Sequence, residues 1–503
     1  MARTSKLGGV AYARREKSYF ERRGLKRHAG VWQLWALAVG AVISGHFSGW
    51  NLGFATGGWG GMLAAGAIIA VMYLGLVFSI AEMSAALPHT GAAYSFARTA
   101  MGPWGGFITG LFENVEYVVT PAVVVTFISG YIGSIIGLEA ALYPILWLMC
   151  FAVFLALNIY GVALSFRVTL VVTLLSLLVL VVFWISAIPH MDFSRWALNV
   201  GTDAGGKPIE LTDGNGPWFP FGFSGVLATL PFAVWLFLAI EQLPLAAEES
   251  IDPQRDMPRG IIAGFLTLLV SAFMIVLLNP SVAGVGAFHL GTSLEPLLDG
   301  FRAIYGDTGA VVLGLVALTG LIASFHTILY AQGRQIYSLS RAGYFPPALS
   351  LTHRTHKTPH VAMVSGSILG LVVMLVIWFA NGGGGDGETQ LGDDVIGTVL
   401  LNMAVFGAML SYIMQALSFI LLRRNRAAIS RPFRSPFGVV GATVTIVIAA
   451  VTLFYQLQDP NFFKGVIWVI LWCAIGILYF AFFGRHRLIL SPEEEFAVAH
   501  ART

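Results

Sequence analysis

Long apolar stretches separated by short polar segments run through this sequence of 503 residues. Each stretch comes close to the roughly 20 residues that an α-helix needs to cross the hydrocarbon core of a bilayer. The stretches lie at residues 31–55, 57–86, 103–134, 142–160, 163–188, 221–246, 260–284, 310–339, 361–380, 397–422, 439–457 and 462–483. Backbone groups in lipid must form their hydrogen bonds within the segment itself, which favours a helix at each of these positions. We therefore predict an all-α membrane protein with twelve transmembrane helices.

The amino-acid composition supports this prediction and excludes other classes of protein. Charged residues make up only 11% of the chain, whereas soluble proteins contain about 25%. The formal net charge is +3, and Lys and Arg lie between the apolar stretches rather than in one patch, so nucleic acid is excluded as a partner. The sequence contains no Gly-x-x-x-x-Gly-Lys-Ser/Thr motif, which excludes ATP as the energy source.

The cysteine and histidine patterns indicate neither a metal site nor a cofactor. Cys150 and Cys473 lie inside apolar stretches and lack CxxC spacing, which disfavours a disulfide framework and a zinc site. The spacing of His353, His356 and His360 could mimic a metal site, but they lie in a basic loop that we expect to be solvated. We expect no metal and no cofactor. A membrane-embedded enzyme is disfavoured as well, because the sequence shows no catalytic triad and no converging set of metal ligands.

Basic residues are concentrated in alternate loops. The basic segments are residues 1–30, 341–357, 423–434 and 485–487, and the acidic or neutral loops are residues 192–213, 295–307 and 386–394. By the positive-inside rule, this alternation predicts twelve spans with both termini in the cytoplasm. We expect a multi-pass protein of the inner (plasma) membrane, with the lipid bilayer as its surroundings.

Two of the predicted spans are interrupted. Residues 44–49 of the first span read Ser-Gly-His-Phe-Ser-Gly, and the sixth span has Pro231 and Pro244 on either side of a carboxylate, Glu241. Interrupted helices at corresponding positions of two halves are typical of secondary transporters built from inverted repeats. The spacing predicts a 5+5 inverted repeat of the LeuT type followed by two additional helices. The predicted units are a basic cytoplasmic tail at residues 1–30, the first repeat at 31–188, an extracellular or periplasmic loop at 189–220, the second repeat at 221–422, two additional helices at 423–483 and a cytoplasmic tail at 484–503.

Three segments resemble the amino acid–polyamine–organocation (APC) superfamily of transporters. Residues 232–259, which include the sequence Ala-Glu-Glu-Ser-Ile-Asp-Pro-Gln-Arg-Asp-Met-Pro, are similar to helix six of that superfamily and the loop after it. Residues 337–346 are similar to its segment after helix eight, and Glu116-Tyr117 is similar to its Leu-Glu-Tyr in helix three. Ala239 stands where the superfamily has the glycine of the helix-six break, so the local residue does not itself favour a break.

Within the superfamily, the chain most resembles the ethanolamine permeases. This resemblance rests on residues 44–51, 87–98 and 102–117. It implies a secondary transporter that takes up ethanolamine, or a related small amine such as choline, by alternating access. Coupling to a proton (H+) and uniport driven by the membrane potential are both open. An amino acid or polyamine transporter or exchanger of the same fold is the alternative. A channel is disfavoured, since it would need neither two broken helices nor an occluding tryptophan.

The chemistry of an amine defines the groups that its site requires. An ammonium group in a low-dielectric cavity must be met by carbonyl oxygens or a carboxylate, and broken helices expose such carbonyls. Ethanolamine has no carboxylate of its own, so a buried carboxylate on the protein suits it. By register with the superfamily, the predicted substrate-binding residues are Ser44, Gly45, His46, Gly49, Glu116, Tyr117, Ala233, Trp235, Leu236, Ser324 and Ile328.

Glu116 is the main candidate for the ammonium contact, because intramembrane carboxylates are functional by default. Its alternative role is a structural pair with another polar group.

The predicted gating or proton-linked residues are Glu241, Trp235 and Glu113. Trp235 matches the gating aromatic of the superfamily and could cover a cation by a cation–π contact, whereas Glu241 could instead form a structural hydrogen bond to a neighbouring helix. His46 could donate a hydrogen bond to the substrate hydroxyl or accept a coupling proton. Its alternative role is structural, as a residue that fills the space left by the break.

Overall fold

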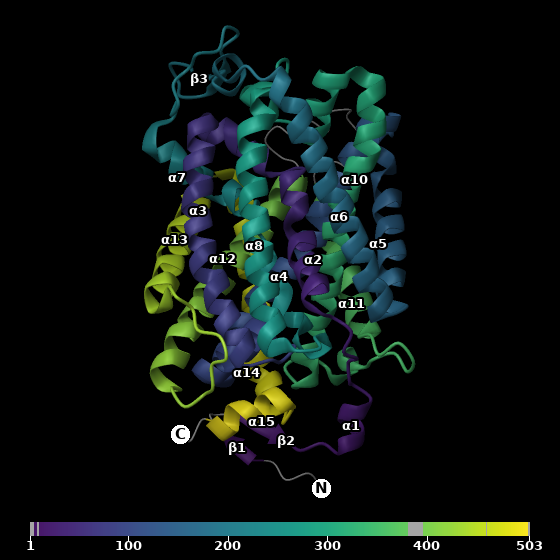
Figure 1. Ribbon diagram of the computed structural model, residues 1–503. Helices are drawn as coiled ribbons and strands as arrows, with labels where there is room; N and C mark the ends of the chain where they lie inside the picture. The colour runs from purple at the N-terminus through teal and green to yellow at the C-terminus, as the bar shows by residue number, and fades with distance from the viewer. Residues whose placement is uncertain (1–4, 8–9, 381–395, 459, 501–503) are drawn as a thin grey trace.

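The computed structural model describes residues 5–7, 10–380, 396–458 and 460–500. The acidic loop that the sequence predicts at residues 386–394 lies outside these ranges. Within them the chain is mostly helical, and its long helices stand side by side in one bundle (Figure 1).

Ten helices of the described chain are long and apolar enough to cross a membrane. They correspond to α3 (Gly53–Ala86), α4 (Ala92–Ile136), α5 (Tyr143–Ile159), α6 (Val162–Ala187), α8 (Pro253–Leu278), α10 (Pro296–Arg341), α11 (His360–Ala380), α12 (Ile396–Asn425), α13 (Gly438–Gln458) and α14 (Pro460–Phe482). Two shorter apolar helices, α2 (Val31–Val42) and α7 (Gly222–Val234), lie where the sequence predicts the first and sixth spans. The protein is therefore an all-α, multi-pass membrane protein, which confirms the predicted class, and the count of twelve spans stays a prediction.

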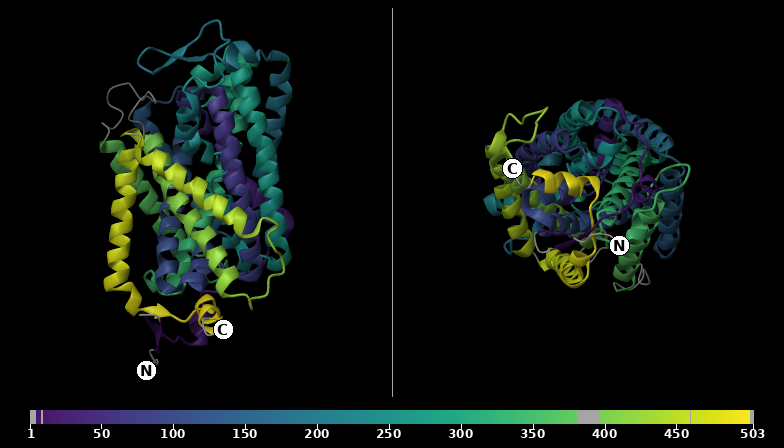
Figure 2. Two further views of the ribbon diagram at one scale, coloured as in Figure 1. Left: turned by 90° about the vertical axis from the view of Figure 1, so that its left-hand side faces the viewer. Right: turned by 90° about the horizontal axis from the view of Figure 1, so that it is seen from below.

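Short elements connect the long helices and cover the two ends of the bundle. The short helices are α1 (Lys17–Glu21), η3 (Ala140–Leu142), η4 (Ile188–His190), η5 (Phe193–Ala197), η7 (Asn279–Ser281), α9 (Gly286–Leu290), η8 (Pro347–Ser350), η9 (Gly484–His486) and α15 (Pro492–Ala499). The strands β3 (Val200–Thr202) and β4 (Pro208–Glu210) form an antiparallel hairpin at one end. At the other end, β2 (Val10–Ala13) pairs antiparallel with β1 (Ser5–Leu7) and parallel with β5 (Leu488–Ile489), so segments from both ends of the sequence meet there (Figures 1 and 2).

Three of the long helices bend sharply at a glycine. The φ angle is 65° at Gly58 in α3, 81° at Gly102 in α4 and 70° at Gly306 in α10, a left-handed region that glycine enters without steric cost. The apolar stretches predicted at residues 103–134 and 310–339 begin just after the bends in α4 and α10. Each bend therefore separates a short first segment from the membrane-spanning part of the helix.

Both spans that the sequence predicts to be interrupted are broken in the structure. α2 ends at Val42 and is followed by two short 3₁₀ helices, η1 (Ile43–His46) and η2 (Trp50–Leu52), before α3 begins. α7 ends at Val234, and the chain continues irregularly to another 3₁₀ helix, η6 (Ile240–Glu249). The predicted inverted symmetry between the two halves stays a prediction.

The helices next to the two breaks form the centre of the bundle. In α2 all residues from 36 to 42 are buried, whereas α5 buries only Trp147, Phe151 and Asn158. α4 packs against α12 and α10, and α2 packs against α8, α6 and α10, while α14 stands at the edge of the bundle (Figure 2). Lipid tails are as apolar as the leucine and valine side chains that face them, so the exposed surface of the outer helices is stable in a bilayer.

Candidate substrate site at the two helix breaks

The two broken segments lie directly against each other. A Cβ atom added to Gly45 would lie 2.1 Å from the carbonyl oxygen of Trp235, and one added to Gly49 would lie 2.7 Å from Nε1 of the same residue. His46 Nε2 is 3.1 Å from the carbonyl oxygen of Leu236, within hydrogen-bonding distance. The absence of side chains at the two glycines therefore allows the first break to approach the second this closely.

Two buried polar atoms at this contact have no hydrogen-bond partner among the described residues. They are Nδ1 of His46 and Nε1 of Trp235. The indole ring of Trp235 stands edge-to-face with Phe127 of α4, with 6.1 Å between the ring centroids. Unpaired polar atoms in a buried position are costly, so these two atoms are where a polar ligand would gain hydrogen bonds.

The second break occurs without the glycine that the superfamily has there. Ala239 takes up the left-handed conformation, with φ of 78°, and it is fully buried. This conformation costs a non-glycine residue roughly 1–2 kcal/mol. The packing of α7 and η6 around Ala239 must compensate for this cost, since the local sequence does not.

The serine pair Ser44 and Ser324 joins the first break to α10. The Ser44 hydroxyl donates to the Ser324 hydroxyl at 2.8 Å, and the Ser324 hydroxyl donates to the carbonyl oxygen of Ala41. One of the carbonyl groups that the end of α2 leaves unpaired is satisfied in this way. Ala233 in the last turn of α7 and Ile328 in α10 are buried as well, and their contact with a substrate stays a prediction.

Glu241, in the first turn of η6, lies at the centre of a hydrogen-bonded cluster. Its two carboxylate oxygens accept hydrogen bonds from the hydroxyl groups of Tyr117 in α4 at 3.2 Å and Tyr412 in α12 at 2.7 Å. The Tyr412 hydroxyl also accepts a hydrogen bond from Tyr73 in α3 at 3.1 Å. Glu241 thus connects η6 to three different membrane-spanning helices.

Glu113 and Glu116 place two further carboxyl groups beside Glu241. Both side chains are fully buried, and both carboxyl groups lie close enough to that of Glu241 to interact with it electrostatically. Among the described residues, none of the three forms an ion pair with Lys, Arg or His, and no group donates a hydrogen bond within 3.5 Å to Glu113 or Glu116. Carboxylates this close repel one another, and the repulsion is relieved when one of them takes up a proton or when a cation lies among them. The cluster can therefore accept a cation or hold a proton.

The predicted site residues thus fall into two groups along α4. Phe127, which contacts Trp235, is ten residues from Tyr117, or about 15 Å along a helix. The first group lies at the contact of the two breaks and consists of Ser44, Gly45, His46, Gly49, Trp235, Leu236 and Ser324. The second group is acidic and consists of Glu113, Glu116, Tyr117 and Glu241.

Sequence reasoning missed Tyr73 and Tyr412, which belong to the acidic group. Each is a single tyrosine in an apolar helix, and both are fully buried. A buried tyrosine hydroxyl usually has a hydrogen-bond partner, so an isolated tyrosine in a predicted span is a usable signal. The local sequence does not predict which carboxylate such a tyrosine would pair with.

The segment after the first break is also anchored by hydrogen bonds to backbone carbonyl groups near the start of α10. The Asn51 amide donates to the carbonyl oxygens of Leu290 at 2.6 Å and Ser293 at 2.8 Å, and the Ser48 hydroxyl donates to the carbonyl oxygen of Leu294 at 2.6 Å. These bonds connect the break to the chain between α9 and α10. Sequence reasoning did not single out Asn51 or Ser48.

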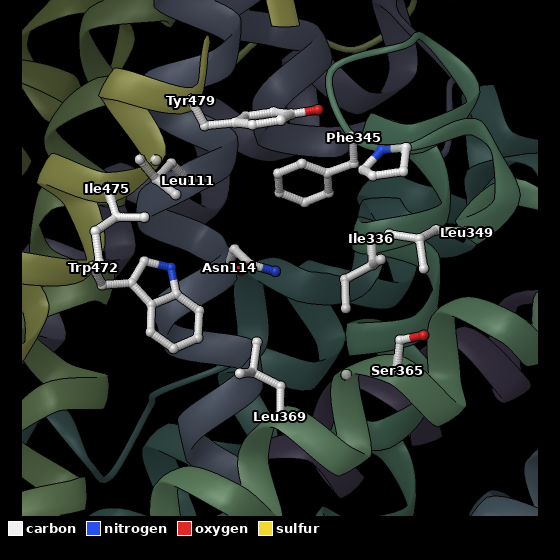
Figure 3. A pocket seen from close by; sticks show the side chains of 13 residues that line it. Leu111, Asn114, Ile336, Phe345, Leu349, Ser365, Leu369, Trp472, Ile475 and Tyr479 are labelled. Atoms are coloured by element: carbon white, nitrogen blue, oxygen red, sulfur yellow. The ribbon is translucent and has the colours of Figure 1, made fainter. Parts of the chain in front are cut away.

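A separate cavity of about 480 Å³ lies between α4, α10, α11, α14 and the segment after α10 (Figure 3). Its lining is mostly apolar and includes Leu111, Trp472 and Tyr479, and it contains none of the predicted site residues. The amide of Asn114, also in the lining, donates to Gln335 Oε1 at 3.0 Å. Since no carboxylate lines this cavity, its chemistry does not suit an amine.

A bundle of membrane-spanning helices with two broken helices at its centre defines the class of protein: a membrane transporter. The sequence profile of the amino acid permease family matches residues 30–482, and the chain belongs to this family. This confirms the resemblance to the APC superfamily and the prediction that the protein is a permease rather than an enzyme.

Similar proteins from bacteria align along most of the chain. A branched-chain amino acid permease of Bacillus subtilis is 24% identical over 91% of this chain and 94% of its own length. A methylthioribose transporter of the same species is 26% identical over 93% of this chain and 95% of its own length. An uncharacterized transporter of Rhizobium meliloti is 26% identical over 86% of this chain and 87% of its own length.

Proposed function

We propose that this permease takes up a small amine, ethanolamine or a close analogue such as choline, by alternating access across the inner membrane. The observation that supports this substrate is the acidic group, in which Glu113, Glu116 and Glu241 lie together without a basic partner among the described residues. An ammonium ion provides the charge that such a group lacks, whereas a substrate carboxylate would be repelled by it. The proposed orientation has both termini in the cytoplasm.

Each part of the site has a proposed role in this uptake. The two breaks supply carbonyl oxygens and the unpaired ring nitrogen of His46 to the polar end of the substrate. Trp235 covers the substrate while it lies at the two breaks. Glu116 contacts the ammonium group when the substrate reaches the acidic group, about 15 Å further along α4. Glu241 and Glu113 act in gating or in holding a coupling proton, because they lie beside Glu116 and Glu241 links η6 to three helices.

An amino acid or polyamine transporter or exchanger of the same fold is the second candidate. It is favoured by the relatives, since one is named a branched-chain amino acid permease and another, from Pseudomonas aeruginosa, a probable GABA permease. An amino acid needs a partner for its carboxylate as well as for its ammonium group, and N–H groups at helix breaks can serve as that partner.

Uptake of radiolabelled ethanolamine into proteoliposomes tests the proposal. Choline, agmatine, arginine and alanine are added in turn as unlabelled competitors. We expect labelled ethanolamine to be taken up, choline to compete with it and alanine to have no effect. Uptake of labelled alanine or arginine, with no uptake of labelled ethanolamine, would support the second candidate.

Substitution of Glu116 tests the role of the carboxylate in the same preparation. We expect Glu116→Gln to weaken amine binding by about tenfold or more, since a charge-assisted contact is lost, and Glu116→Asp to weaken it far less. Scintillation proximity binding measures both. Equal binding by the wild type and Glu116→Gln would remove Glu116 from the site.

A further inference from the structure

The last part of the described chain, residues 488–500, packs against the end of the bundle that also holds β1 and β2 (Figures 1 and 2). Its strand β5 pairs with β2, and the backbone N–H of Ile489 donates to the carbonyl oxygen of Ala342 at 2.8 Å. A Cβ atom added to Gly343 would lie 2.5 Å from the carbonyl oxygen of Arg487. We call residues 488–500 the C-terminal segment; it lies directly on the turn that follows α10.

Glu494 joins α15 to three parts of the chain that are distant in sequence: β2, the first part of α4 and the turn after α10. Its carboxylate accepts hydrogen bonds from Tyr12 at 2.7 Å, Tyr94 at 3.3 Å, Arg98 at 2.6 Å and Tyr344 at 2.9 Å. Burial raises the pKa of the Tyr12 hydroxyl, and the Glu494 carboxylate raises it further, so this hydroxyl stays protonated and donates. Because the carboxylate is fully buried, it is stable only where such partners surround it.

Glu493 reaches η6 through one arginine. The guanidinium group of Arg341, at the end of α10, donates to Glu493 at 3.0 Å and to Glu248, in the last turn of η6, at 2.6 Å. Glu493 is 1% exposed. The chain Glu493–Arg341–Glu248 therefore ties the C-terminal segment to the same 3₁₀ helix that contains Glu241.

The segments held in this way border the acidic group, because Ala92, Leu245 and Ala331 pack with Tyr117 in one buried cluster. These segments are η6, the end of α10 and the first part of α4, before its bend at Gly102. We infer that the C-terminal segment is a closing element: it holds these three segments together, and it must release Arg341 and Arg98 before the site can open at this end. The inference rests on the proposed alternating-access transport, because only that mechanism requires the opening.

Hydrogen–deuterium exchange of the full chain in nanodiscs, without substrate, tests this inference. In the double variant Glu493→Gln, Glu494→Gln, the amides of residues 240–249 and 92–101 should exchange about tenfold faster, because charge-assisted hydrogen bonds at both ends of the closure are lost. Tyr344→Phe removes one hydrogen bond to Glu494 and should give a smaller increase in residues 92–101.

Glu495→Gln is the matched control. Glu495 is the next residue of the same helix and is exposed, so its exchange pattern should equal that of the wild type. Unchanged exchange at residues 240–249 and 92–101 in the double variant would overturn the inference, and so would a uniform increase that includes α6 and α8, which indicates general destabilisation. The exchange measurement is made without substrate, so it does not depend on which substrate is transported. Failed ethanolamine uptake would refute the proposed function, but it would not affect the exchange measurement.

Discussion

The two helix breaks bring their segments together by different means. In the first break, glycines at positions 45 and 49 leave the space into which Trp235 fits. In the second, Ala239 has a side chain and still adopts a left-handed conformation, which costs roughly 1–2 kcal/mol. The first break is therefore favoured by its own residues, whereas the second is imposed by the packing around it. Glu241, two residues after Ala239, depends on that imposed geometry to reach Tyr117 and Tyr412.

The largest effect is expected for Gly45→Ala, which tests whether the first break tolerates any side chain. The added Cβ would lie 2.1 Å from the carbonyl oxygen of Trp235, so the two breaks would have to move apart. We expect loss of uptake in proteoliposomes and a destabilisation of about 3 kcal/mol or more, since overpacking against backbone cannot be relieved by a rotamer change.

Gly61→Ala is the control for this substitution. Gly61 is buried in α3, and a Cβ atom there would have no heavy atom within 4 Å among its non-neighbouring described residues. This variant should transport like the wild type and be at least as stable, because alanine is favoured over glycine in a helix by up to about 1 kcal/mol. Normal uptake by Gly45→Ala would show that the close contact between the breaks is dispensable.

Glu241→Gln tests whether transport requires the carboxylate that the second break places between Tyr117 and Tyr412. A glutamine has one acceptor oxygen, so it cannot accept from both Tyr117 and Tyr412 in the way that the carboxylate does. We expect the initial rate of uptake to fall by about tenfold, with expression and thermal stability largely retained. Tyr412→Phe should lower the rate less, because one hydrogen bond to Glu241 remains; an unchanged rate in both variants would make Glu241 unnecessary for transport.

His46→Ala tests the bond that joins the two breaks. The carbonyl oxygen of Leu236 loses its contact with the imidazole ring, and the buried space around His46 is left empty. We expect a destabilisation of about 1–3 kcal/mol, seen as a lower thermal midpoint and a severalfold slower uptake. His28→Ala, which changes an exposed side chain, should leave both quantities unchanged; if His46→Ala does the same, the bond between the breaks adds nothing to stability.

The smallest effect is expected for Ala239→Gly, and the informative quantity is the sign of its change in stability. Glycine enters the left-handed region without steric cost, so this variant should be more stable by about 1 kcal/mol. Ala228→Gly, in the regular part of α7, should be less stable by a similar amount. Thermal unfolding of the two variants measures the difference, and equal destabilisation in both would mean that Ala239 is not strained.

Local sequence was sufficient for the helices and for the first break. Apolar stretches indicated the long helices, and small residues at 44–49 indicated the interruption after α2. Pro231 and Pro244 indicated an interruption of the sixth span, but they did not locate it at Ala239. Alanine favours a helix, and only tertiary packing overrides that preference. The contacts of Tyr73, Tyr412 and Glu494 could not be predicted, since each joins residues that are distant in sequence and belong to different helices.

The contact between Tyr12 and Glu494 spans 482 positions of the sequence, and this has a consequence for how the protein is made. During synthesis the N-terminal residues leave the ribosome first, so β2 must wait for its parallel neighbour β5 until nearly the whole chain has been translated. Tyr12, Tyr94 and Arg98 remain without their shared carboxylate throughout that time. The end of the bundle that holds η6 and the acidic group can therefore reach its final packing only after the last helix of the chain has been made.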